Sequence, residues 1–259
     1  MSKKNESLIQ SPISADVAVQ GTDDVEGECE RVLQELVDAY YLSSDTNFPR
    51  PVIWLSGAPG SGKGANSCHV MRALGISAEP IVVSDLLNSE DLKNRKDHGD
   101  LIDSRIVVRA VLAALLRCKG GEGVIMDGYP RSFFQAKFLH LLGKKIQSLT
   151  GIDSQFCMIV FSVDEQTSLD RQLLRGRKAI VHNQEVKQSQ SGVLREVRPT
   201  DTDETLARKR YRNFLDNTDA ALRYLQASGM PFVEIDSRGS FEEVKKRIEQ
   251  KVRKWNPIL

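Results

Sequence analysis

Five short, mostly apolar runs separated by segments with helical spacing constrain the fold of this chain more than any other feature of its sequence. Runs of this kind are typical of strands that are buried on both faces. Such strands, when they alternate with helices, form a parallel sheet covered by helices on both sides. The predicted strands are Val52–Leu55, Pro80–Val83, Gly123–Met126, Phe156–Val163 and Phe232–Ile235. We therefore expect an α/β fold around a parallel five-stranded sheet, with helices in segments such as Leu101–Arg117 and Asp203–Gln226.

The first 48 residues are predicted to be an extension that precedes the main domain. Residues 1–24 are polar and lack periodicity, which is typical of a disordered tail. Between Val25 and Leu42, apolar residues recur at steps of three and four, the spacing of an amphipathic helix that docks on a neighbouring domain. Pro49 and Pro51 then prevent the helix from continuing. We place the main domain at residues 49–259.

Charge and cysteine content narrow the classes of partner and of cellular setting. The 36 Lys and Arg residues balance 35 Asp and Glu residues, so the chain has no overall field that would attract nucleic acid or a membrane surface. No stretch approaches the about 18 consecutive apolar residues of a membrane span. The four cysteines form no C-x-x-C pair, which disfavours a zinc site or a disulfide framework and fits reduced thiols. We expect a cytoplasmic monomer that binds small molecules.

A glycine-rich segment, WLSGAPGSGKGANS at residues 54–67, joins the first predicted strand to a helical pattern. The spacing Gly57-x4-Gly62-Lys63 is that of a P-loop. A turn of this kind leaves backbone N–H groups pointing inward, and the N-terminus of the following helix adds partial positive charge, so phosphate is its natural ligand. A purely structural turn is the alternative, but the strand before the loop and the helix after it favour phosphate binding.

The residues that follow the lysine depart from the usual P-loop. Gly64 and Ala65 come after Lys63, so no hydroxyl stands where a P-loop commonly offers one to magnesium. Magnesium must then be held by phosphate oxygens, by water and by an acidic group elsewhere. Asp127 follows a predicted buried strand, at the edge where parallel sheets bind ligands, and can orient magnesium-bound water. The alternative is that Asp127 ends the strand in a plain turn with Gly128.

Three segments resemble adenylate kinases and related nucleoside monophosphate kinases, a family of P-loop NTPases. GAPGSGKG at residues 57–64 resembles the family's loop, in which glycine likewise follows the lysine. GVIMDGYPRSFFQAKFL at 123–139 resembles its third strand and the continuation, and VDEQTSLDRQLLRGR at 163–177 resembles the helix that leads into its lid. The resemblance runs from about Pro51 to the C-terminus. It implies a P-loop core with a short monophosphate-binding segment at about residues 84–110 and a lid at about residues 176–200. The polar, weakly patterned sequence of Lys178–Pro199 independently predicts a mobile insertion there.

The resemblance implies reversible transfer of the γ-phosphoryl group of ATP, bound with Mg²⁺, to a nucleoside monophosphate, with AMP as the favoured acceptor. The implied ATP-binding residues are Gly57, Ala58, Pro59, Gly60, Ser61, Gly62, Lys63, Gly64, Ala65, Arg171 and Arg175. The implied catalytic residues are Lys63, Arg131, Arg171, Arg175 and Arg210. Arg171 and Arg175 are four residues apart, a spacing that places both guanidinium groups on one helix face, where they can meet a triphosphate. A charged helix face without a ligand is the alternative.

The acceptor side is implied by the same resemblance and by a looser one in three further segments, VVSDLLN at residues 82–88, GDLIDSRIVVRAVLAALL at 99–116 and REVRPTDTDETLARKRYRNF at 195–214. Its residues are Asp85, Leu101, Ile102, Gly128, Arg131, Gln135, Arg198 and Arg210. The amide of Gln135 carries both a donor and an acceptor, which suits an adenine edge. The guanidinium of Arg131 offers a planar fork to a phosphate, and a solvated surface arginine is the alternative there.

The chain departs from the family pattern near both ligands. Ala65 stands where the family commonly has threonine, and Ser84 stands where it usually has glycine. Asn88 takes the place of an arginine, so a monophosphate loses one cationic clamp unless Lys93 or Arg95 substitutes. Two other functions therefore stay open. One is a P-loop kinase of another small acceptor, such as a sugar or a small acid, against which the glutamine amide and the arginine pair argue; the other is a nucleotide-binding module without catalysis.

Overall fold

The computed structural model describes residues 24–87 and 102–255, and within them the five predicted strands form one parallel sheet. The strands are β1 (Val52–Gly57), β2 (Ile81–Val82), β3 (Val124–Asp127), β4 (Phe156–Ser162) and β5 (Phe232–Asp236), in the spatial order β2-β3-β1-β4-β5. The α/β fold with a parallel five-stranded sheet is thereby confirmed. Leu55 in β1 pairs with Asp127 in β3, so the carboxyl ends of these two strands lie side by side.

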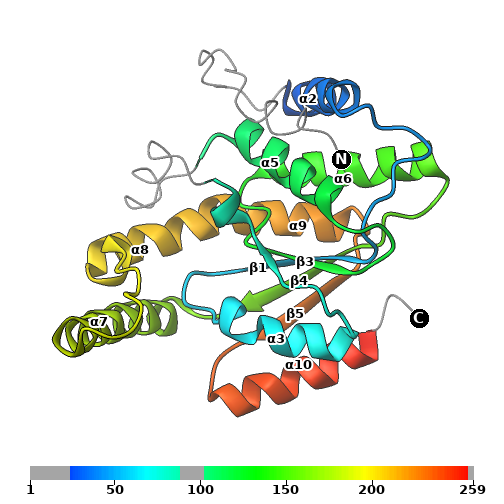
Figure 1. Cartoon of the computed structure of the whole chain (residues 1–259). Coiled ribbons are helices and arrows are strands. Elements are labelled where there is room, and N and C mark those ends of the chain that lie inside the picture. The colour runs from blue at the N-terminus through cyan, green and yellow to red at the C-terminus, as the bar shows by residue number, and fades with distance from the viewer. Residues whose placement is uncertain (1–23, 88–101, 256–259) are drawn as a thin grey trace.

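Helices cover both faces of this sheet (Figure 1). They are α2 (Val25–Ala39), α3 (Lys63–Leu74), α5 (Ser104–Arg117), α6 (Phe133–Thr150), α7 (Glu165–Ser189), α8 (Glu204–Asn213), α9 (Ala220–Ala227) and α10 (Phe241–Trp255). Along β1, Val52 and Trp54 join the core that contains α5, α6 and α9, whereas Ile53 and Leu55 join the core that contains α3 and α10. Successive side chains of a strand point to opposite faces, which explains why β1 is apolar at every one of these positions. Within residues 24–87 and 102–255, no helix is both long and apolar enough to cross a membrane.

The predicted helical stretch over residues 203–226 is divided in the structure. α8 and α9 lie in line, and the π-helical segment Phe214–Asp219 joins them. A π-helical turn inserts extra backbone into an otherwise regular helix and shifts the faces of its two halves relative to one another. The sequence spacing predicts the helix but not this shift.

The largest difference from the sequence prediction lies in α7. Residues 178–189, predicted to belong to a mobile insertion, continue α7 as helix to Ser189. The chain then runs back along the helix: the Asn183 side chain donates to Arg195 O at 2.8 Å and accepts from the Arg195 backbone N–H at 2.8 Å. Beyond Ala179 no residue of α7 is buried, so this half of the helix needs no apolar stripe. Its Gln, Glu and Lys residues are good helix formers nonetheless.

α2 belongs to the main core and is not a loose appendage. Its buried apolar residues, Cys29, Val32, Leu33, Leu36 and Val37, lie in the same cluster as those of α5 and α6. The helix ends at Ala39, three residues before the predicted end at Leu42, and the Leu42 backbone N–H donates to Val37 O at 2.9 Å. Of the predicted tail at residues 1–24, residues 1–23 lie outside the described residues.

The packing of α2 predicts a large contribution to stability. Leu36 is 1% exposed, so Leu36→Ala should lower the free energy of unfolding by about 2–5 kcal/mol. Urea denaturation followed by circular dichroism measures this change. Glu30→Ala, at an exposed position of the same helix, is the matched control and should change the free energy by less than about 0.5 kcal/mol. An equally small effect of Leu36→Ala would contradict the packing of α2 into the core.

Candidate active site

The glycine-rich loop connects the carboxyl end of β1 to the N-terminus of α3, and it is pressed against two other elements. A Cβ atom at Gly57 would lie 2.4 Å from a backbone oxygen of β4, and one at Gly60 would lie 2.6 Å from a backbone oxygen of α7. Gly62 adopts φ +78° immediately before α3 begins at Lys63. Only glycine can make such a close approach at a positive φ, so the packing of the loop requires glycine at Gly57 and Gly60.

The other loop residues complete this contact with α7. The Ser168 hydroxyl of α7 donates to Pro59 O at 2.7 Å, and Ala58 is 1% exposed beneath the loop. Gly64 and Ala65 lie exposed in the first turn of α3. The N-terminus of α3 is therefore open to solvent, and the N-terminus of a helix attracts anions.

Lys63 faces one carboxylate and several cations at the edge of the sheet. Burial is the main cause that lowers the pKa of the Lys63 ammonium to about 8. Asp127 opposes this shift, whereas the guanidinium groups of Arg131, Arg210 and Arg175 add to it. Positive charge is thus concentrated beyond what Asp127 alone can balance, which is the electrostatic setting of an anion site.

Three buried polar atoms in and beside the loop have no hydrogen-bond partner within the described part of the chain: Ser61 Oγ, Asn66 Oδ1 and Asp127 Oδ1. Because buried polar atoms in folded proteins are nearly always paired, such atoms mark places for a ligand, an ion or water. No group of three or more His, Cys, Asp or Glu residues among those the structure describes could hold a metal. The unpartnered Asp127 Oδ1 fits the predicted role of this residue in orienting magnesium-bound water.

The turn after β3 brings Gly128, Arg131 and Gln135 together. Arg131 Nε donates to Gly128 O at 2.8 Å, and the Arg131 backbone N–H donates to Gln135 Oε1 at 2.8 Å. Gln135 is 3% exposed, and its Nε2 donates to Ser104 Oγ at 3.3 Å. The Arg131 side chain is exposed to solvent. The protein around the guanidinium group nevertheless lowers the pKa of Arg131, chiefly by burial, and Asp127 opposes this shift. These side chains hold one another in place without a ligand.

Asp201 connects two arginines from different helices. It is 3% exposed, and its carboxylate accepts from Arg175 Nε at 2.7 Å and from Arg175 Nη2 at 2.5 Å. Arg210 Nη1 lies 3.8 Å from Asp201 Oδ1. Burial lowers the pKa of Arg210 to about 10; Arg131, Arg175 and Arg198 add to the shift, and Asp201 opposes it. Arg175 and Arg210 are therefore positioned on one carboxylate while remaining close to other cations.

Arg171 and Arg175 have different partners although they are four residues apart in α7. Arg171 donates to Ser237 O at 2.9 Å and to Gly239 O at 3.2 Å, in the loop that follows β5. Its Nη1 also lies 3.5 Å from Gly60 O in the glycine-rich loop. Arg171 thus supports the loop from the β5 side, whereas Arg175 faces Asp201. That both arginines meet one triphosphate stays a prediction.

The remaining predicted acceptor residues have other hydrogen-bond or packing partners. Arg198 donates from Nε to Glu196 at 2.7 Å, and Asp85 is exposed and accepts from Ser84 Oγ at 3.3 Å. Ile102 packs, half-buried, against the main core. Leu101 lies outside the described residues, as do Asn88, Lys93 and Arg95.

Two serines that the sequence did not single out join this network. Ser104 Oγ and Ser132 Oγ are 2.8 Å apart, and Ser132 Oγ accepts from the Gln135 backbone N–H at 3.3 Å at the start of α6. The sequence holds a signal for Ser132, since Ser-x-x-Gln before an apolar run is a capping-box pattern. Ser104 could not be found in this way, because its contact joins residues 31 positions apart.

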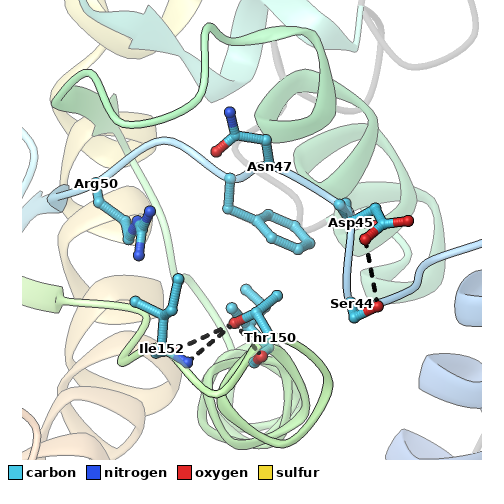
Figure 2. Close-up of a pocket in the computed structure, with 9 residues that line it drawn as sticks. Ser44, Asp45, Asn47, Arg50, Thr150 and Ile152 are labelled. Carbon is cyan, nitrogen blue, oxygen red and sulfur yellow. Dashed lines mark hydrogen bonds between the residues drawn. The ribbon is translucent and has the colours of Figure 1, made fainter.

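A cavity of about 260 Å³ lies at the opposite end of β1, beneath the linker that precedes this strand (Figure 2). It is lined by Ser44, Asp45, Thr46, Asn47, Phe48, Arg50, Ile146, Thr150 and Ile152. These residues come from the linker and from the end of α6 and the turn after it, which precede the amino ends of β1 and β4. The length of β1 therefore separates the cavity from the glycine-rich loop, and none of the predicted site residues lines it.

Comparison with protein families places the same residues in a known class. A family model described as an AAA domain matches residues 56–188, a range that contains the glycine-rich loop, Asp127, Arg131 and both arginines of α7. Among solved structures, a gluconokinase from Sinorhizobium meliloti 1021 is similar with a TM-score of 0.47 and 15% identity, covering 80% of this chain and 94% of that chain.

Curated relatives of the chain are kinases of the family that the sequence motifs resemble. An adenylate kinase from Corynebacterium glutamicum (strain R) is 30% identical over 152 residues, which cover 55% of this chain and 78% of the relative. A UMP-CMP kinase from Lentinula edodes is 27% identical over 248 residues, which cover 86% of this chain and 96% of the relative. The chain therefore belongs to this AAA domain family and to the adenylate kinase and nucleoside monophosphate kinase family of P-loop phosphotransferases, as a divergent member.

Proposed function

We propose that this chain transfers the γ-phosphoryl group of ATP reversibly to a nucleoside monophosphate, with AMP as the preferred acceptor, so that ATP and AMP give two ADP. The observation that carries the proposal is the gathering of Asp127, Arg131 and Arg210 around Lys63, where Asp127 ends β3 beside β1. Partly desolvated cations of this kind can neutralise the negative charge of the ATP phosphates and of the acceptor phosphate when the two are brought together. Relatives named adenylate kinase and UMP-CMP kinase support the same acceptor class.

The donor side of the proposal rests on the loop. Its backbone amides and the N-terminus of α3 would hold the phosphates of ATP, and Lys63 would reach the β- and γ-phosphates. Magnesium, when bound with ATP, supplies further charge neutralisation. Asp127 would orient water of that magnesium through Oδ1, which has no partner among the described residues. Because Ala65 offers no hydroxyl to magnesium, the Asp127 carboxylate would be the protein group that orients the ion.

Three arginines would surround the transferred phosphoryl group. Arg131 comes from the turn after β3, Arg175 from α7 and Arg210 from α8. Phosphoryl transfer needs little covalent chemistry from the protein, so fixed cations and alignment of the two nucleotides provide most of the acceleration. The far half of α7 and residues 190–198 project beyond the sheet (Figure 1), and they would cover the phosphates and exclude water as a competing acceptor.

Gln135 would select the acceptor base. Its Oε1 and Nε2 already bond to the Arg131 backbone and to Ser104, but an amide oxygen has a second lone pair and an amide nitrogen a second hydrogen. These could meet the amino group and a ring nitrogen of adenine, with Ile102 beside the base. Arg198 and Arg210 would hold the acceptor phosphate, and Asp85 would lie at the edge of its pocket.

We also propose that the protein works as a monomer in the cytoplasm. All four cysteines are free thiols, two of them buried. Burial raises the pKa of Cys29 and of Cys157 to about 12, which keeps both as unreactive thiols. Size-exclusion chromatography with light scattering tests the monomer.

The first functional prediction is that Lys63→Ala abolishes phosphoryl transfer. The lysine charge meets negative charge that develops on the phosphates, and loss of one such contact typically costs on the order of 10²-fold or more in kcat. A coupled assay of ADP formation from ATP and AMP measures the loss. Arg72→Ala, at the far end of the same helix, is the matched control and should keep wild-type turnover. Near-normal activity of Lys63→Ala would mean that the loop is not the donor site.

The second prediction concerns pH. Lys63 is charged below its pKa of about 8 and loses this charge as the pH rises through that value. The kcat/KM for ATP, which reports the free enzyme, should therefore fall above pH 8, by up to about tenfold per pH unit. Lys63→Arg keeps its charge in this range, so its lower activity should not show the fall. A wild-type profile that stays level to pH 9.5 would contradict the proposed role of the ammonium.

The third prediction is that AMP gives the highest kcat/KM among AMP, dAMP, GMP, CMP and UMP. An unpaired buried amide costs about 1–3 kcal/mol, enough for roughly tenfold to hundredfold discrimination. Gln135→Ala should therefore lower the preference for AMP more than it lowers turnover with the best pyrimidine. Faster phosphorylation of CMP or UMP by the wild type would replace the adenylate assignment with a pyrimidine one.

The same assay separates the two other functions. Sugars and small acids should be added to the acceptor panel, because transfer to one of them and to no monophosphate would indicate another P-loop kinase. ATP binding without transfer to any acceptor would indicate a nucleotide-binding module.

A further inference from the structure

α2 lies beside the starts of both helices that carry the proposed acceptor side (Figure 1). Glu28 of α2 forms an ion pair with Arg105, in the first turn of α5. The Glu28 side chain is 9% exposed and that of Arg105 is 31% exposed, so the pair is largely shielded from water. The hydrogen bond to Glu28 is the main cause that raises the pKa of Arg105.

α2 is also attached to the start of α6. Lys137 Nζ lies 2.8 Å from Glu26 Oε1, and the Cys29 thiol donates to Phe134 O at 3.5 Å. The Glu26 side chain is 64% exposed, so water screens this second ion pair far more than the first. One helix thus contacts the first turns of both α5 and α6, and the shielded contact is the one to α5.

These first turns carry the side chains that would meet the acceptor. Ser104 directly precedes Arg105, and its hydroxyl accepts from Gln135 Nε2 and lies 2.8 Å from Ser132 Oγ. Gln135 in turn accepts from the Arg131 backbone N–H. A shift of the first turn of α5 would move Ser104 away from Gln135 and free the amide to rotate.

We propose that Glu28 is a positioning residue for the acceptor site: it acts through Arg105 to hold the first turn of α5, and with it Ser104, against Gln135. The inference rests on the proposed monophosphate kinase function. It assigns a role in acceptor binding to a helix that precedes both the kinase motifs and the residues matched by the family model. The donor loop lies on other elements, so its affinity for ATP does not depend on Glu28.

Glu28→Gln in the full chain tests the proposal because the amide keeps the shape of the side chain and removes its charge. The KM for AMP should rise about tenfold, as expected when a binding group is misplaced by a fraction of an ångström, while the KM for ATP stays within about twofold. Calorimetric titration with AMP should give the same loss of affinity without turnover. Both measurements are made at a temperature where circular dichroism shows each variant to be folded.

The controls distinguish positioning from general stability. Glu30→Gln removes a charge from an exposed position of α2 and should leave both KM values unchanged. Arg105→Gln should match Glu28→Gln, and the double variant should be no worse than either, because the two groups act as one pair. If Glu28→Gln fails to fold, Glu28→Asp keeps the charge with a shorter reach and should raise the KM for AMP about threefold.

The outcomes separate this inference from the function on which it rests. Equal changes of both KM values, or unchanged values in a folded Glu28→Gln or Glu28→Asp variant, would overturn the positioning role and leave the kinase function standing. A wild-type protein that binds ATP but neither binds nor phosphorylates any nucleoside monophosphate would overturn both.

Discussion

Positive charge outweighs negative charge at the carboxyl ends of β1 and β3, and the surrounding fold must hold these groups together. Burial and neighbouring guanidinium groups disfavour the charged form of Lys63, and Asp127 only partly offsets them. The sign of the effect on stability follows from the lowered pKa. Between pH 8 and about pH 10.4, the ordinary pKa of lysine, the unfolded chain binds more protons at Lys63 than the folded chain does. The free energy of unfolding therefore rises with pH in this window, and Lys63 lowers it most below pH 8. At neutral pH the cluster is therefore destabilising without an anion, and a bound phosphate would reverse this effect.

The rest of the fold holds these charges in place against their repulsion. The pairing of β1 with β3 fixes Asp127 beside the strand that leads into the loop, and the close approach of Gly57 and Gly60 to β4 and α7 fixes the loop itself. Asp201 restrains Arg175 and lies 3.8 Å from Arg210. The core beneath the acceptor side includes α2, so the N-terminal extension and the site share one hydrophobic cluster. Cations that would otherwise separate are thus held by elements whose stability comes from apolar packing elsewhere.

The sheet and the loop could be predicted from the sequence because both are written in local patterns. Apolar runs such as Val52–Leu55 mark strands regardless of their partners, and the glycine spacing marks the turn into α3. Contacts between distant residues could not be predicted. The ion pair of Glu28 with Arg105 spans 77 positions, and the bond from Arg171 to Ser237 spans 66. The sequence does not predict α7 beyond residue 177 for another reason: a helix that projects from the core has no apolar periodicity.

The proposed function requires that the γ-phosphoryl group of ATP moves to a nucleoside monophosphate on this protein. The most direct measurement follows ATP labelled with ¹⁸O in the γ-phosphoryl group, incubated with AMP, magnesium and the purified wild-type chain, by ³¹P nuclear magnetic resonance. The label should appear in the β-phosphate of ADP formed from AMP, at a rate far above that of a Lys63→Ala sample. Label that stays in ATP, or that appears only in inorganic phosphate, would contradict the proposed function.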